Sequence, residues 1–285
     1  MAKGHALIRK LVLCPRFHPF DFSAGLCYSY VAKYAEERKA PSVAEPIVII
    51  PGFLLTPGRF KEMRAALRAL GNTHVRVVPT TVGDWAASIS AAGWARILSK
   101  IEWTVKSLLE EVGAEKAVLV GHSAGGVMGR LFLGPEPFRH HVYDARKYVR
   151  GLITLGTPHQ GRRGSPMRRK VHALYPGACF APEVTYLSVA GKAIRGDREG
   201  SSRERTSYRG YKVLCGSGEI WGDGAVPVDS ALLEGSRPLV LEGVHHSCMR
   251  ENRRWYGSAD VVAEWWQAWL EHKGSGPEPP IQRTT

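Results

Sequence analysis

Hydrophobic residues in this chain gather in short uninterrupted runs, which alternate with stretches of helical spacing. The runs are rich in β-branched side chains and lack the polar alternation of a half-exposed strand. They predict strands over 47–50, 75–78, 117–120, 149–155, 211–215 and 238–241. Apolar residues three and four positions apart predict helices over 58–70 and 94–112, one behind residue 123, and one after residue 258 whose core face is Val262, Trp265, Trp266 and Trp269.

This alternation predicts an α/β fold, with a mostly parallel central sheet and helices on both of its faces. The 285 residues, 44% of them hydrophobic, suffice for one sizeable core. We expect an N-terminal extension over 1–45 with a helix around 24–39, one domain over 46–272, and a disordered tail over 273–285. Within the domain we expect a loop over 80–93 and a lid or cap insert over 162–209.

The net charge of +13 is unevenly distributed. Between residues 162 and 209 there are eleven Lys and Arg against four Asp and Glu, so this stretch alone carries +7. Such an excess favours an acidic substrate or an anionic membrane surface as partner, and a solvated, flexible loop is the alternative interpretation. The sequence contains no helix-turn-helix, zinc-finger or RNA-binding signature, so we expect no nucleic-acid partner. It gives no indication of oligomeric state.

Five cysteines, at positions 14, 27, 179, 215 and 248, form no Cys-x-x-Cys pair and are odd in number. This usage is typical of reduced thiols, so we expect an intracellular, reducing compartment, either the cytoplasm or an organelle such as a plastid, with peripheral attachment to a membrane as an option. No apolar run reaches the ~20 residues that span a bilayer. The first residues lack the continuous apolar core of a secretory signal, which leaves a transit peptide as the alternative.

The segment 117–126, Ala-Val-Leu-Val-Gly-His-Ser-Ala-Gly-Gly, joins a predicted buried strand to a helix through a Gly-x-Ser-x-Gly turn. Gly121 and Gly125 remove side chains two positions before and after Ser123, as a turn this tight requires. A helix that starts behind the serine directs unpaired amides and a positive dipole end at the reacting atoms. We therefore interpret Ser123 as a nucleophile. The alternative is an incidental serine in a glycine-rich turn.

A serine nucleophile needs a base and an acid that orients the base, and on this architecture the acid and then the base follow the serine along the chain. Asp223 lies in a Gly-Asp-Gly turn behind the predicted strand 211–215, with Glu219 and Asp229 as nearby alternatives. His245 and His246 follow the last predicted strand, which is where the base should arrive.

Two further histidines, His122 and His159, fall outside this order, and we interpret them as packing or loop-bracing residues. No group of His, Cys and carboxylate residues has convincing metal-ligand spacing. There is also no Gly-x-Gly-x-x-Gly and no Walker loop. We therefore expect neither a metal nor a cofactor.

Stabilising the oxyanion of acyl transfer takes two backbone amides. One should come from Ala124, the residue after the nucleophile, and the other from Phe53, in the loop after the first strong strand. Gly52 lets that loop come close to the substrate. Phe53, Leu54 and Leu55 could line an acyl pocket, although an ordinary core position is an equally good interpretation of Leu54 and Leu55.

Three segments together resemble the lipase-like branch of the α/β-hydrolase superfamily, namely bacterial triacylglycerol lipases and their plant and cyanobacterial relatives. They are Gly-His-Ser-Ala-Gly-Gly at 121–126, Leu-Gly-Thr-Pro-His-Gln-Gly at 155–161 and Gly-Asp-Gly-Ala-Val-Pro at 222–227. In the Val-x-His-Ser ending at 244–247 the histidine of the family falls on His246. The resemblance covers about 45–270 and implies an α/β-hydrolase fold, a Ser123–Asp223–His246 triad, and oxyanion donors at Phe53 and Ala124.

The sequence departs from this family in two places. Pro51 stands where many lipases have a histidine, and the loop 248–254 is basic where secreted lipases often hold calcium, so we expect no calcium site. The resemblance implies a serine hydrolase that cleaves carboxylic esters, with lipid acyl esters as the expected substrate, through an acyl-enzyme. The alternatives are an esterase or thioesterase for small soluble acyl compounds, and a non-catalytic α/β-hydrolase-like module that binds a lipid or a protein.

Overall fold

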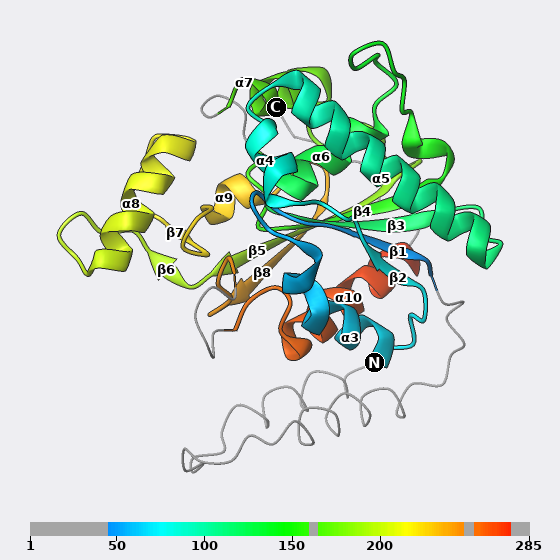
Figure 1. Cartoon of the computed structure of the whole chain (residues 1–285). Coiled ribbons are helices and arrows are strands. Elements are labelled where there is room, and N and C mark those ends of the chain that lie inside the picture. The colour runs from blue at the N-terminus through cyan, green and yellow to red at the C-terminus, as the bar shows by residue number, and fades with distance from the viewer. Residues whose placement is uncertain (1–44, 160–164, 248–253, 275–285) are drawn as a thin grey trace, which may run out of the picture.

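A central sheet of parallel strands organises the molecule (Figure 1). The computed structural model describes residues 45–159, 165–247 and 254–274. Within these ranges the sheet has six strands in the order β2-β1-β3-β4-β5-β8. The strands are β1 (Ile47–Ile50), β2 (Val75–Val77), β3 (Ala117–His122), β4 (Val149–Leu155), β5 (Thr185–Lys192) and β8 (Arg237–Glu242). Two short strands, β6 (Ile194–Arg195) and β7 (Trp221–Gly222), form a separate antiparallel pair.

Helices cover both faces of the sheet (Figure 1). On one face lie α5 (Ala91–Val112) and α6 (Ala124–Leu133), and on the other lie α3 (Lys61–Ala69) and α10 (Ala259–Gly274). The remaining helices are η1 (Pro57–Phe60), α4 (Val82–Ala87), η2 (Ala145–Lys147), α7 (Pro166–Leu174), α8 (Ser202–Cys215) and α9 (Val228–Ala231). None of the helices in the described ranges is long and apolar enough to cross a membrane.

Two hydrophobic cores, one on each face, explain why the strands read as continuous apolar runs. Val48 and Ile50 of β1 belong to the core beneath α5 and α6, whereas Ile47 and Ile49 belong to the core beneath α3 and α10. Because successive side chains of a strand point to opposite faces, a strand covered on both sides keeps no polar positions. The closing helix packs as predicted: Val262, Trp265, Trp266 and Trp269 are all buried.

The predicted strand over 211–215 is wrong, because these residues form the last part of α8. A capping box between Ser201 and Glu204 starts this helix, and Gly216 in the left-handed conformation ends it. Tyr211 is fully buried, while the next residue of the run, Lys212, is exposed. The run is therefore one edge of a helix, and five residues are too few to distinguish this from a strand.

The predicted lid or cap insert over 162–209 is not a single body. It contains β5, which lies inside the central sheet between β4 and β8. The apolar stretch at 184–194 is visible within the basic insert, but its basic surroundings gave no sign that it belongs to the central sheet. The chain after β5 leaves the sheet through β6, α8 and β7, and this group projects from one end of the sheet in Figure 1.

The predicted loop over 80–93 contains the short helix α4, which a capping box between Thr81 and Asp84 begins. The expected tail over 273–285 starts too early, because Lys273 and Gly274 still belong to α10. Its remaining residues, the helix expected around 24–39 and residues 1–44 of the expected extension lie outside the described residues.

Candidate active site

Ser123 occupies a strained turn between β3 and α6. Its backbone angles, φ 53° and ψ −123°, fall where residues with a side chain are rarely found. Neighbouring backbone leaves no room for side chains here: a Cβ on Gly121 would lie 2.5 Å from Gly126 Cα, and one on Gly125 would lie 2.2 Å from Ile50 O. The two glycines therefore fit this turn for the reason that the sequence suggested.

The structure brings Ser123, His246 and Asp223 together in a continuous relay. His246 Nε2 lies 3.0 Å from Ser123 Oγ, and His246 Nδ1 lies 2.7 Å from Asp223 Oδ2. With the proton on Nδ1, the ring donates to the carboxylate and Nε2 accepts from the serine hydroxyl. Of the two adjacent histidines, it is thus His246 and not His245 that reaches the serine.

Asp223 is buried, with 1% of its surface exposed, and is held by four hydrogen bonds through its side chain. Its Oδ1 accepts from the amides of Ala225 and Val226 at 2.9 and 2.7 Å, and its Oδ2 accepts from His246 and from the Tyr256 hydroxyl at 2.9 Å. Burial by itself raises the pKa of Asp223, but the charge and hydrogen bonds of its partners outweigh burial and hold that pKa below 3.8. The carboxylate is therefore ionised and fixed in direction.

Tyr256 is a member of this site that the sequence did not reveal. Its hydroxyl accepts from the Gly191 amide at the end of β5 at 2.7 Å and donates to Asp223. It thereby ties the acid to the sheet edge. Tyr256 belongs to no motif, and a buried tyrosine cannot be told from a core residue in a single sequence.

His122 braces the loop that carries the base. Its Nε2 donates to the carbonyl of His246 at 2.7 Å, and the two rings lie 4.9 Å apart. Burial first, and then the charge of His246, lower the pKa of His122 to about 3. The ring is therefore neutral at physiological pH and serves as a fixed donor.

His159 lies in a second buried network, beneath α6. Its Nε2 is 3.0 Å from Thr154 Oγ1, and its Nδ1 faces a guanidinium nitrogen of Arg130 at 3.4 Å. Burial, followed by the charge of Arg130, lowers the pKa of His159 well below 6.5. Like His122, it braces a loop and does not take the place of the base, in agreement with the sequence-based interpretation.

The two predicted oxyanion donors flank the serine. Ala124 opens α6, where the first amides of a helix have no intrahelical partner. Phe53 follows Gly52, at which a Cβ would lie 2.9 Å from Ser123 Cβ, so this loop lies directly against the nucleophile. Among the described residues, no hydrogen bond engages the N–H of Phe53 or Ala124. Both amides are available to a substrate oxygen.

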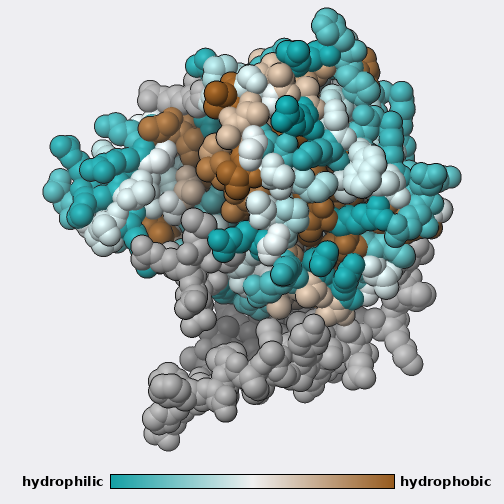
Figure 2. All heavy atoms as spheres, in the orientation of Figure 1, coloured by the Kyte–Doolittle hydropathy of each residue, from teal (hydrophilic) through white to brown (hydrophobic). Residues whose placement is uncertain are grey.

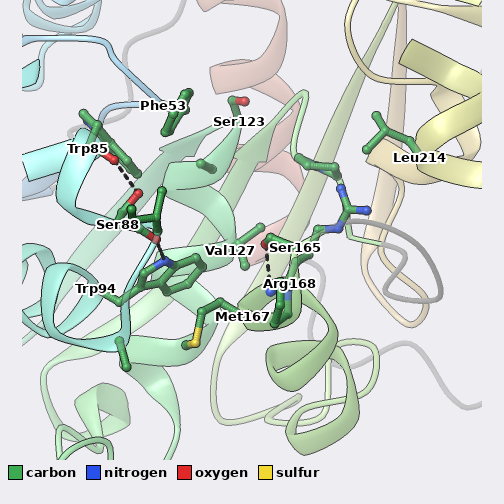
Figure 3. A pocket seen from close by; sticks show the side chains of 15 residues that line it. Phe53, Trp85, Ser88, Trp94, Ser123, Val127, Ser165, Met167, Arg168 and Leu214 are labelled. Atoms are coloured by element: carbon green, nitrogen blue, oxygen red, sulfur yellow. Dashed lines mark hydrogen bonds between the residues drawn. The ribbon is translucent and has the colours of Figure 1, made fainter. Parts of the chain in front are cut away.

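A cavity of about 770 Å³ opens beside Ser123 (Figure 3). The side chains that line it are mostly apolar: Phe53, Trp85, Ser88, Ile89, Ala91, Trp94, Ser123, Ala124, Val127, Pro158, Ser165, Pro166, Met167, Arg168 and Leu214. Hydrophobic residues also form a patch in Figure 2 between α8 and α4, two elements that contribute to this lining. The cavity can accept an extended apolar group next to the serine.

Leu54 and Leu55, expected to line an acyl pocket, are not among the described residues that line this cavity. The backbone reverses at Leu54, whose φ is 60°, and leaves its side chain 46% exposed. Leu55 packs instead against the core beneath α3 and α10. Of the three residues predicted for the pocket, Phe53 alone lies there.

No group of three or more His, Cys, Asp or Glu within the described ranges could hold a metal ion. Of the predicted acids, Asp223 is the one that faces the base. The relay can transfer a proton from Ser123 to His246 and stabilise the resulting imidazolium with Asp223.

The sheet and the site together define the α/β-hydrolase fold. The parallel sheet carries a Gly-x-Ser-x-Gly turn between a central strand and its helix, and the acid and the histidine follow later strands in that order. This fold carries many activities, so the site must decide the function.

No protein-family model matches the sequence, and no curated protein matches it. Solved structures do match. The product of gene lin2722 from Listeria innocua is 14% identical, with a TM-score of 0.47 over 82% of this chain and 96% of that one. Thermogutta terrifontis esterase 2, phosphoramylated by tabun, is 13% identical, with a TM-score of 0.47 over 82% and 87%. An alpha-beta serine hydrolase homologue from Coxiella burnetii is 13% identical, with a TM-score of 0.44 over 82% and 86%. At these values the likeness does not extend to activity or substrate.

Proposed function

We propose that this chain is a serine hydrolase that cleaves carboxylic esters through an acyl-enzyme intermediate. The observation that carries the proposal is the hydrogen-bonded series Ser123–His246–Asp223. Its serine lines a cavity and lies beside two free backbone amides. A Ser–His–Asp relay next to oxyanion donors is the arrangement that acyl transfer requires. A non-catalytic binding module would need neither the strained serine nor the fixed acid.

In the first half of the reaction, Ser123 Oγ attacks the carbonyl carbon of the ester, and its proton passes to His246 Nε2. The amides of Phe53 and Ala124 donate to the oxyanion that forms. Asp223 stabilises the imidazolium and keeps its ring in the orientation that faces the serine.

The tetrahedral intermediate then collapses to the acyl-enzyme, and His246 Nε2–H protonates the departing alcohol. In the second half, water attacks the carbonyl carbon of the acyl-enzyme and gives up a proton to the same nitrogen. The second tetrahedral intermediate releases the carboxylic acid, and His246 returns the proton to Ser123 Oγ.

For the substrate we propose an acyl ester with an extended apolar part, as in a lipid, because aromatic and aliphatic side chains dominate the cavity. Small soluble esters and thioesters are the competing substrates. Rates measured on a series of acyl chain lengths, below and above the concentration at which each ester aggregates, distinguish the two. Equal rates on short and long chains would contradict the lipid proposal.

A fluorophosphonate probe tests the hydrolase proposal directly, because it reacts covalently with an activated serine. We expect labelling of the wild type, and none of the Ser123→Ala variant. Ser88→Ala is the matched control, since Ser88 lines the same cavity but its hydroxyl donates to the Trp85 carbonyl. Absence of labelling in folded wild-type protein would overturn the proposal.

A further inference from the structure

Arg168, near the start of α7, is a buried cation whose side chain has no hydrogen-bond or ion-pair partner among the residues that the structure describes. Only 8% of its surface is exposed. Its Nε and Nη2 atoms are inaccessible to solvent and have no hydrogen-bond partner, and no ion pair among the described residues includes it. A buried guanidinium that lacks an anion destabilises the fold, so the native packing tolerates a cost at this position.

Arg130, the other deeply buried arginine near the site, has a structural role and serves as a comparison. Its guanidinium donates to the carbonyl of Tyr175 and faces His159 Nδ1. Arg130 thereby joins α6 to the segment after α7. Arg168 makes no comparable side-chain bond to any residue that the structure describes, so bracing does not account for it.

Arg168 lines the cavity that holds Ser123, and its side chain extends from α7 toward Leu214 of α8 (Figure 3). The other described residues that line the cavity are apolar residues or serines. Among the described lining residues, Arg168 is therefore the one with a charged side chain. Burial lowers the pKa of Arg168, and the Cys215 thiol offsets that effect in part. An arginine nevertheless stays protonated near neutral pH, so the cavity carries a positive charge in an apolar wall.

We infer that Arg168 binds an anionic group of the substrate, so that the preferred ester carries a carboxylate or phosphate in the part that enters the cavity beside α7. This inference rests on the proposed esterase function and names its substrate class. A guanidinium N–H forms a charge-assisted hydrogen bond with either anion, and exclusion of water strengthens it. In Arg168 this donor is Nη1, because Nε and Nη2 are inaccessible. The substrate would supply the counter-ion that the described residues do not provide.

Ser165 is placed to assist. Its Oγ accepts from the Arg168 amide at 3.3 Å as the cap of α7, so its hydroxyl hydrogen remains available to a bound anion. The substrate is then an amphiphile. Its reacting carbonyl lies at Ser123, its apolar part lies against the aromatic wall, and its anionic group lies at Arg168.

The test compares esters that differ in charge alone. On the acyl side the pair is mono-p-nitrophenyl suberate and p-nitrophenyl octanoate, and on the alcohol side it is the butyryl ester of ω-hydroxyhexanoic acid and hexyl butyrate. We expect the wild type to prefer the anionic member of at least one pair, which also identifies the side that faces Arg168. In Arg168→Met we expect kcat/KM for that anionic ester to fall by about 10- to 100-fold, with little change for its neutral partner.

Arg169→Met is the matched control, because it removes the same charge from the next, exposed residue of the same helix. We expect Arg169→Met to keep the wild-type preference. Arg168→Met should also raise Tm, since it removes an unpaired buried charge. Suberate should raise the Tm of the wild type and leave that of Arg168→Met unchanged.

The inference is overturned if the wild type treats charged and neutral esters alike, or if Arg168→Met slows both to the same extent while fluorophosphonate still labels Ser123. Failure of the labelling itself would instead overturn the proposed hydrolase function. The Tm measurements then still report whether Arg168 binds an anion.

Discussion

At the scale of single residues, the site depends on contacts between positions that are distant in the chain. Ser123 and His246 are separated by 123 positions, and His246 meets Asp223 twice, through its ring and through its amide, which donates to the Asp223 carbonyl at 2.9 Å. His122 completes the arrangement by holding the carbonyl of His246. The base is therefore fixed from three directions before a substrate arrives.

The buried, neutral state of His122 makes stability depend on pH. Its pKa is about 3 in the folded chain and 6.5 as the ordinary value, so between these values the unfolded chain binds a proton that the folded chain does not. The contribution of His122 to the free energy of unfolding is therefore complete above pH 6.5 and is lost as the pH falls toward 3. The loss amounts to about 1 kcal/mol per pH unit.

In His122→Gln this dependence should be absent. Urea unfolding from neutral pH to about pH 5 should show the wild type losing its advantage over the variant as the pH falls. His140→Gln, at an exposed position, is the control and should follow the wild type. A constant difference between wild type and His122→Gln would contradict the assigned burial effect.

At the scale of elements, three backbone segments pack closely at the turn between β3 and α6: the end of β3, the start of α6 and the loop after β1. The loop after β1 lies against this turn, and glycines at 52, 121 and 125 let the backbones meet. The strain at Ser123 persists because the packed sheet on one side and α6 on the other hold the turn in place. The capped ends of α4 and α8 show that local signals also shape the walls of the cavity.

Gly125→Ala tests this packing. Its Cβ would lie 2.2 Å from Ile50 O and 2.6 Å from Pro51 O, and both neighbours are backbone atoms that cannot move aside. We expect the free energy of unfolding to fall by about 1–3 kcal/mol, and fluorophosphonate labelling to slow at least tenfold as the loop carrying Phe53 is displaced. Gly58→Ala is the control, because its Cβ would lie 4.0 Å from the nearest atom, Thr56 Oγ1.

At the scale of the whole molecule, positive charge lies next to the cavity. Helices α7 and α8 contribute Arg168 and Leu214 to the lining and carry exposed basic residues on their outer surfaces: Arg169, Lys170, Arg203, Arg205, Arg209 and Lys212. We propose that this face approaches an anionic membrane surface and directs the cavity toward it.

Two cysteines in the described ranges, Cys179 and Cys215, are free thiols. We propose a reducing compartment for this chain, where such thiols stay reduced.

Vesicle cosedimentation tests this surface. Each exposed Lys or Arg near an anionic membrane adds about 1 kcal/mol to binding. Arg203→Glu/Arg209→Glu on α8 should therefore weaken binding to phosphatidylserine vesicles by more than tenfold. Lys61→Glu/Arg68→Glu on α3, across the sheet, makes the same change in net charge and should have a smaller effect. If both variants lost vesicle binding equally, net charge alone would explain the binding, and the proposed membrane-facing surface would be wrong.

The sequence by itself determined what depends on local patterns. Continuous apolar runs indicated the strands buried on both faces, helical spacing indicated α5 and α10, and the Gly-x-Ser-x-Gly turn followed from backbone crowding that only glycine relieves. Residue types and their chain order also selected Ser123, Asp223 and the adjacent pair His245 and His246, because an α/β-hydrolase sheet delivers the three roles in that order. The family resemblance then indicated His246.

Only the tertiary structure decided what depends on distant neighbours. In the run over 211–215 Tyr211 is buried and Lys212 is exposed, as on a helix, and β5 lies in the sheet between β4 and β8. Tyr256 reached Asp223, and Arg168 reached the cavity, through packing that no local spacing encodes. Such contacts gain their free energy from burial between remote segments, and a linear pattern does not contain that information.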